Sequence, residues 1–171
     1  MKKTTMSDNT YKLALTAVFS ALVFIFTFFV KIPVGPGYIH IGDSIIYLFA
    51  CLVGGPWAMA AGALGATLAD LVGGYAIYAP FTAISKPLIA IPLMLAAKHS
   101  ENGKIITVRT VVATLIAALI TALSYFIADL VIARAYAFAD IPRSFVQSGA
   151  STIAFIIFGL ALQKVKIPNL R

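Results

Sequence analysis

The sequence predicts an all-α integral membrane protein: a single domain over residues 1-171, built as a bundle of six transmembrane helices. Hydrophobic residues make up 61% of the chain and charged residues only 11%, whereas soluble domains are about 45–50% apolar and about 25% charged. The apolar stretches recur along the whole chain, so a cleaved signal peptide does not explain this composition. Glycine, proline and polar residues separate the stretches, as connections between helices would.

The predicted helices follow from apolar length, since a spanning helix needs about 20 mostly apolar residues. The first carries one charge, Lys12, near its start. The second is short for a full span and ends at the turn 54–56, and the third is rich in small residues. The fourth contains two prolines, and the polar loop 99–106 separates it from the fifth. The six helices are expected at residues 10-30, 43-54, 56-73, 81-98, 107-134 and 142-163.

Lysine and arginine predict the orientation, because cytoplasmic loops carry an excess of both. With six spans, one side carries Lys2, Lys3, Lys12, Lys98, Lys104, Arg109, Lys164, Lys166 and Arg171. The opposite side carries Lys31, Arg134 and Arg143. The N- and C-termini are therefore expected in the cytoplasm of a multi-pass cell-membrane protein. This placement also explains the net charge of +7 without nucleic-acid binding.

Ionisable residues gather in the predicted outer half of the bundle, where Asp43, Asp70 and Asp129 join His40 and Lys86. Such residues cost several kcal/mol at membrane depth unless they are paired or hydrated, and they mark functional sites by default. Asp43 precedes an apolar helix, so it is either a site residue or an N-cap. Lys86 lies about one turn into a span and needs water or an acid, for which Asp70 is a plausible partner.

Two tyrosine-bearing outer loops flank these residues. Residues 31–42 contain prolines and glycines that break both helix and strand. Their apolar members favour a loop folded back as a lid that brings Tyr38 and His40 to the site; the alternative is an interfacial loop with an aromatic anchor. Tyr75 and Tyr78 can stack on a ring or donate hydroxyls, or they can belong to the aromatic belt of the membrane.

Two further candidates lie on the last helices. Tyr125 is one turn before Asp129 on an apolar helix, which favours a site role for both. Gln147 lies near the outer end of the sixth helix, one turn after Arg143, and its amide can face the bundle and contact a polar ligand.

Small residues on the first helix suggest a second kind of site. Ala14, Ala17 and Ala21 follow one another at helical spacing, and Ala17 with Ala21 matches the small-xxx-small pattern. Small side chains let helices approach closely in lipid. This face either packs inside the bundle or docks onto a membrane partner.

The order of these motifs resembles the substrate-binding S component of an energy-coupling factor (ECF) vitamin transporter. The resemblance covers nearly the whole chain. It rests on the run GYIHIGDSIIYL at 37–48, the stretch DLVGGYAIYAP at 70–80, the later Lys86 and the alanine spacing on the first helix.

The resemblance implies a six-helix bundle that holds a vitamin near its outer face and performs no chemistry. It implies docking through the first helix onto an EcfT-like transmembrane coupling protein, which two cytoplasmic ATPases drive. The chain itself has no glycine-rich phosphate loop ending in Lys-Ser or Lys-Thr. The expected substrate-binding residues are Tyr38, His40, Asp43, Tyr47, Asp70, Tyr75, Tyr78, Lys86, Tyr125, Asp129 and Gln147.

The substrate expected from the resemblance is vitamin B6 or hydroxymethylpyrimidine. The acidic DFSD-type stretch of riboflavin binders is missing, with GYIHIGDS in its place. The tryptophan-rich pattern of thiamine binders is also missing, since the sole tryptophan, Trp57, is at a predicted cytoplasmic turn. Riboflavin, or another small ring compound, is the alternative in a subgroup often labelled as riboflavin transport.

Two other classes compete with a transporter subunit. A stand-alone secondary transporter could use the acids as an ion relay, but the chain shows no pseudo-symmetric pair of interrupted helices. A small membrane enzyme would need a nucleophile–base pair or a metal cluster, which a chain with two histidines hardly offers.

Overall fold

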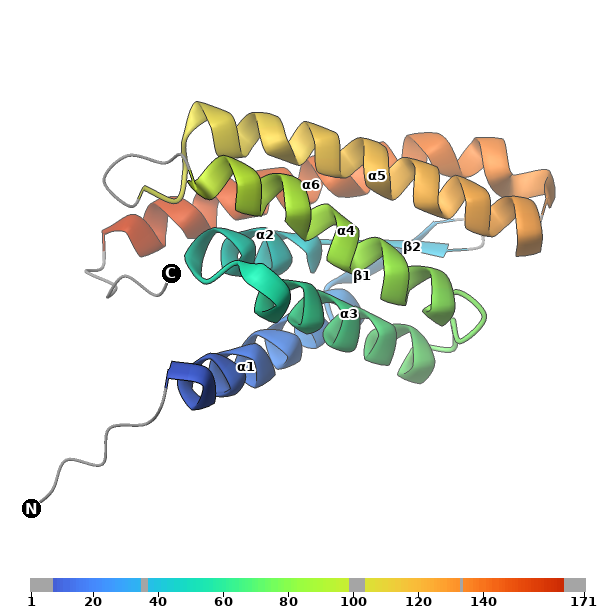
Figure 1. The fold of residues 1–171 in the computed structure, drawn as a ribbon. Coiled ribbons are helices and arrows are strands. Elements are labelled where there is room, and N and C mark those ends of the chain that lie inside the picture. The colour runs from blue at the N-terminus through green and yellow to red at the C-terminus, as the bar shows by residue number, and fades with distance from the viewer. Residues whose placement is uncertain (1–7, 35–36, 99–103, 133, 165–171) are drawn as a thin grey trace, which may run out of the picture.

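The computed structural model describes residues 8–34, 37–98, 104–132 and 134–164. Four residues behind the orientation prediction, Lys2, Lys3, Lys166 and Arg171, lie outside these ranges. Figure 1 shows a helical bundle with one small hairpin. The elements are α1 (Asp8–Phe28), β1 (Lys31–Val34), β2 (Gly37–His40), α2 (Asp43–Leu52), α3 (Gly55–Val72), α4 (Ala79–Lys98), α5 (Val108–Ile132), the 3-10 turn η2 (Arg134–Tyr136) and α6 (Ala137–Gln163).

The helical, membrane-type fold is confirmed. Among the described residues there are six α-helices, and four helical segments are long and apolar enough to cross a membrane: α1, α4, α5 and the segment 134–163. Helix α2 has only 10 residues, and α3 is not one of the four. Six full spans therefore remain a prediction, although the six helices lie close to their predicted bounds.

Helix α2 is short because it forms the centre of the bundle. Its residues from Asp43 to Cys51 are all buried, and it packs against α1, α3, α4 and α6. The length of an apolar helix that is covered on every side by protein does not have to match the thickness of the bilayer.

Helices α1 and α3 pack closely because α3 presents small side chains. A Cβ atom added at Gly65 would lie 2.3 Å from the backbone oxygen of Ser20, so only glycine permits this approach. The buried residues of α3 include Ala58, Ala61 and Ala69. The small residues of this helix therefore serve packing inside the bundle.

Residues 31–34 and 37–40 form strands that the sequence did not predict. Strands β1 and β2 pair antiparallel, from Lys31 opposite His40 to Val34 opposite Gly37. The expectation that prolines and glycines here exclude a strand was wrong. Pro33 is tolerated because a two-stranded ribbon consists of edge strands, where a missing N–H need not cost a ladder bond. Two further residues of this kind, Gly35 and Pro36, lie outside the described residues.

Helix α6 begins five residues before the predicted start at residue 142. The prediction placed Pro142 at the helix start, but the proline lies inside the helix. At the sixth position of α6 the proline removes one backbone hydrogen bond, and the helix continues on both sides of it. Asp140 in the first turn of α6 interacts favourably with the positive end of the helix dipole.

Candidate functional site

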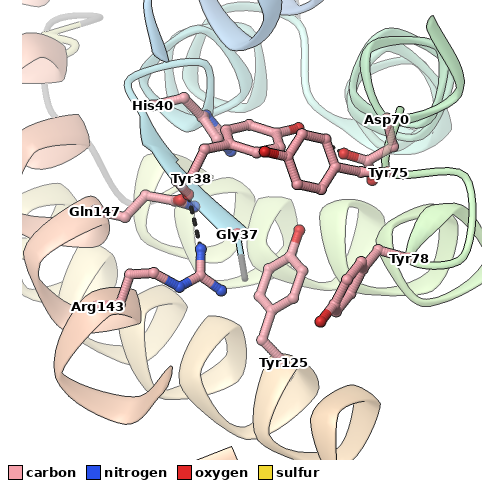
Figure 2. Close-up of a pocket in the computed structure, with 9 residues that line it drawn as sticks. All are labelled: Gly37, Tyr38, His40, Asp70, Tyr75, Tyr78, Tyr125, Arg143 and Gln147. Carbon is pink, nitrogen blue, oxygen red and sulfur yellow. Dashed lines mark hydrogen bonds between the residues drawn. The ribbon is translucent and has the colours of Figure 1, made fainter. Parts of the chain in front are cut away.

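A small pocket lies at the hairpin end of the bundle (Figure 2). Strand β2, the end of α3, the turn after it, α5 and α6 all contribute to its wall. The lining residues are Gly37, Tyr38, His40, Asp70, Tyr75, Tyr78, Tyr125, Arg143 and Gln147. The structure thus brings together seven of the eleven predicted residues. The other four, Asp43, Tyr47, Lys86 and Asp129, are buried behind or away from this wall.

Fixed tyrosines dominate the pocket. The hydroxyl of Tyr38 donates to Asp70 Oδ1 at 2.5 Å. Burial, together with the neighbouring carboxylate, raises the pKa of Tyr38 well above its usual value, so the phenol stays protonated as a donor. Its ring lies 4.6 Å from that of Tyr75, centroid to centroid. The hydroxyls of Tyr125 and Thr82 lie 3.2 Å apart, and in Figure 2 the Tyr125 hydroxyl points toward the rings of Tyr38 and Tyr75. These rings form a preorganised surface on which a flat ligand could stack.

The His40 side chain is neutral. Its Nδ1 accepts a hydrogen bond from the backbone N–H of Gly42 at 3.0 Å, so the ring proton is on Nε2. Burial is the main cause that lowers the pKa of His40 to about 3, and the cations Lys86 and Arg143 act in the same direction while Asp43 opposes them. The wall of the pocket therefore offers a neutral imidazole at physiological pH.

The neutral imidazole predicts a pH dependence of stability. Below about pH 6.5 an unfolded chain protonates this histidine, whereas the folded chain does not until about pH 3. Stability should therefore be constant above pH 7 and fall by about 2 kcal/mol between pH 7 and pH 5. The substitution His40→Gln keeps an acceptor for Gly42 and should remove this part of the fall. Denaturant unfolding of both proteins in detergent at pH 5, 6 and 7 measures the difference, and parallel profiles would contradict a neutral His40.

Arg143 ties α6 to the hairpin and closes one side of the pocket. Its Nη1 donates to the backbone oxygen of Tyr38 at 2.7 Å, and its Nε donates to Asp140 Oδ1 at 2.5 Å. The guanidinium lies 5.9 Å from the ring centroid of Tyr125, within cation–π range. From the sequence, Arg143 was expected only to contribute to the orientation pattern. The available signal was its spacing of one turn from Gln147, which puts both side chains on one helix face.

A buried ion pair lies behind the pocket. Lys86 Nζ and Asp43 Oδ1 are 2.7 Å apart, and their side chains are 0% and 1% exposed. Gln147 Nε2 donates to the second oxygen of Asp43 at 3.2 Å. Two expectations are thereby corrected. The partner of Lys86 is Asp43 and not Asp70, which accepts from Tyr38. Asp43 is not an N-cap, because Gly42 occupies that position and makes no side-chain cap bond.

Two predicted residues have other surroundings. Tyr47 is fully buried, and its ring packs edge-on against Phe155, with the centroids 5.9 Å apart. It is a core residue in this structure. Asp129 accepts a hydrogen bond from the Tyr78 hydroxyl at 2.6 Å, so its contact with the pocket runs through that tyrosine.

The pocket is narrow. The space at its centre is about 20 Å³, which is room for about one water molecule. A vitamin ring can enter only if β2 or the facing tyrosines move. Among the described residues, no group of three His, Cys, Asp or Glu side chains could hold a metal ion.

Comparison with known protein families decides the class of this protein. The family of ECF-type riboflavin transporters, S component, matches residues 7–164. The chain belongs to this family. It is thus a membrane-embedded S component, the substrate-binding subunit of a vitamin transporter that works with an EcfT-type protein and ATPases, and the family is not an enzyme class. The predicted vitamin B6 or hydroxymethylpyrimidine subgroup is not confirmed, since the family description names riboflavin. No curated protein sequence matches the chain.

Proposed function

We propose that this S component captures a small ring-containing vitamin in the tyrosine pocket and delivers it through an EcfT-like coupling protein driven by two cytoplasmic ATPases. The observation that carries the proposal is the pocket itself, with its four tyrosines, Asp70 and Arg143 at one end of an apolar bundle. Aromatic faces with a few fixed polar groups are typical of sites for small ring compounds.

The charge distribution supports an outward-facing pocket. Lys31 is the first residue of the hairpin, and Arg134 and Arg143 belong to the same end of the bundle. Described residues of the opposite end include Lys98 and Lys104 near the α4–α5 connection, Arg109 in α5 and Lys164 after α6. The more basic end is expected in the cytoplasm.

Labelling of intact cells with a membrane-impermeant thiol reagent tests this orientation. In a background without Cys51, the reagent should label Arg134→Cys and should not label Lys104→Cys. The reverse pattern would invert the orientation.

The proposed substrate is a single heteroaromatic ring with hydroxymethyl groups, of the vitamin B6 or hydroxymethylpyrimidine kind. The small pocket supports a single ring, and the Nε2–H of His40 and the amide of Gln147 can serve such polar groups. The family description favours riboflavin as the second candidate. A tricyclic flavin would require a larger movement of the hairpin.

Calorimetry on the purified protein separates the candidates. Pyridoxine, hydroxymethylpyrimidine and riboflavin are titrated in turn, and native mass spectrometry of mildly purified protein reports any vitamin that co-purifies. We expect one of the single-ring compounds to bind with one-to-one stoichiometry. Binding of riboflavin alone would replace the proposed substrate and keep the pocket. If the folded protein binds none of these or any co-purified vitamin, the proposed function fails.

Tyr125→Ala should weaken ligand binding about 5- to 150-fold, because it removes a stacking ring and a hydroxyl worth about 1–3 kcal/mol. Asp129→Asn should act only through Tyr78, whose hydroxyl donates a hydrogen bond to the Asp129 carboxylate. In a Tyr78→Phe background, Asp129→Asn should therefore add nothing to the loss of affinity. Calorimetry on the four variants tests this, and a full additional loss in the double variant would instead place Asp129 on the ligand.

The hairpin should become more ordered over bound ligand. Strand β2 is held to α6 by Arg143 and by a hydrogen bond of 3.3 Å from Ser151 Oγ to the backbone oxygen of His40, and ligand entry must break or shift these contacts. Amide exchange at residues 37–40 should slow at saturating vitamin, while residues 58–66 of α3 serve as the unchanged control. Equal exchange with and without ligand would leave an ordinary interfacial hairpin.

A further inference from the structure

An apolar groove runs between α4 and α5, and it shares no residue with the tyrosine pocket. It encloses about 700 Å³. Helix α4 contributes Leu88, Ile91, Pro92, Leu95 and Ala96, and α5 contributes Val108, Arg109, Val112, Ala113, Ile116 and Ile120. Figure 1 shows the two helices side by side.

The groove is accessible from the bilayer. Leu95, Val112 and Ile116 are 53%, 49% and 50% exposed, so its edges face the surroundings of the bundle. Ala96 and Ala113 contribute only methyl groups to its lining, which leaves the space between the helices unfilled. Both α4 and α5 are long and apolar enough to cross a membrane, and the groove therefore lies at the depth of acyl chains.

Positive charge is concentrated at one end of this groove. Arg109 lies in the first turn of α5 and is its one charged lining residue. Lys98 is the last residue of α4, and Lys104 is exposed in the connection before α5. The start of α5 adds the partial positive charge of a helix N-terminus.

We propose that this groove binds an anionic phospholipid, with one acyl chain between α4 and α5 and the headgroup phosphate at Arg109. A basic end on an apolar groove between membrane helices is the arrangement that holds anionic lipid headgroups. Arginine suits a phosphate because its planar guanidinium can donate two parallel hydrogen bonds. The apolar wall supplies burial of the chain, and the basic end selects the headgroup.

Native mass spectrometry with added lipid tests the charge. The protein in neutral detergent is titrated with dioleoyl phosphatidylglycerol and, separately, with dioleoyl phosphatidylcholine, which differs only in the headgroup. We expect one phosphatidylglycerol to bind more tightly than phosphatidylcholine. Arg109→Gln should lower this affinity about five-fold, whereas Lys12→Gln, which removes a cation from α1, should leave it unchanged. Equal binding of both lipids, or equal effects of the two substitutions, would overturn the proposal.

A second arm tests the groove itself. Ala96→Phe fills the space with a ring and keeps every charge, so it should weaken retention of phosphatidylglycerol several-fold. Leu64→Phe, on an exposed position of α3 (58% exposed), should not. Circular dichroism and thermal unfolding show that each variant is folded. Unchanged retention in folded Ala96→Phe would mean that the lipid binds by surface charge alone, and the proposed groove site would be wrong.

Discussion

Lys86→Met should destabilise the protein by about 3–5 kcal/mol, because it leaves the carboxylate of Asp43 buried without its cation. The two groups are 2.7 Å apart and almost fully enclosed. Methionine keeps the length of the lysine stem, so the lost packing is small. The amide of Gln147 remains on Asp43, but one neutral donor does not compensate a buried charge. Denaturant unfolding in detergent gives the free energy.

A double variant separates the charge from the packing. Asp43→Asn with Lys86→Met removes both charges and should recover most of the stability lost in the single variant, since a buried pair and its neutral replacement are often similar in stability. Lys31→Met is the matched control. The Lys31 ammonium lies 4.5 Å from the ring centroid of Phe28 in a partly exposed position, and its loss should cost about 1 kcal/mol or less. A double variant as unstable as Lys86→Met alone would contradict the role of the pair.

The sequence could not identify this pair for a physical reason. Asp43 and Lys86 are 43 residues apart, and their contact depends on how α2 inserts into the centre of the bundle. Asp70 lies nearer to Lys86 in the chain and is also at the outer end, so sequence reasoning favoured it. Local patterns give the length and type of a helix; the rotation of one helix against another depends on packing across the whole bundle.

Other residues of the site could be predicted from the sequence because they are polar or aromatic in an otherwise apolar chain. Tyrosines and ionisable groups in an apolar chain are costly unless they have partners, and Tyr38, Asp70 and Tyr125 do reach the pocket. Arg143 was missed because an arginine near a helix end also fits the orientation rule. The hairpin was missed because glycine and proline usually interrupt strands, and the sequence does not show that these strands form a ribbon with two edges.

Replacement of Ala17 and Ala21 by tryptophan should abolish vitamin uptake while ligand binding stays intact. In the structure, Ala14, Ala17 and Ala21 are all exposed, whereas the buried positions of α1 are Thr16, Val23 and Thr27. Packing of these alanines inside the bundle, the alternative that the sequence left open, would require burial. We therefore expect the face to dock onto the coupling protein, where small side chains let helices approach closely in lipid.

The paired measurement is ligand affinity of the purified double variant and ATP-dependent uptake in liposomes that contain the coupling protein and both ATPases. Leu119→Trp with Leu123→Trp is the control, since both leucines are 60% exposed and have the same spacing on α5. The control should bind and transport normally if α5 faces lipid. Tryptophans at internal positions would lower the free energy of unfolding by about 1–3 kcal/mol through overpacking and would reduce ligand binding as well. Loss of both binding and uptake in the variant with tryptophan at positions 17 and 21 would therefore place these residues inside the bundle. Docking through α1 requires close approach of two helices, and two tryptophans on this face would prevent it. Retained uptake would therefore mean that the coupling protein docks elsewhere.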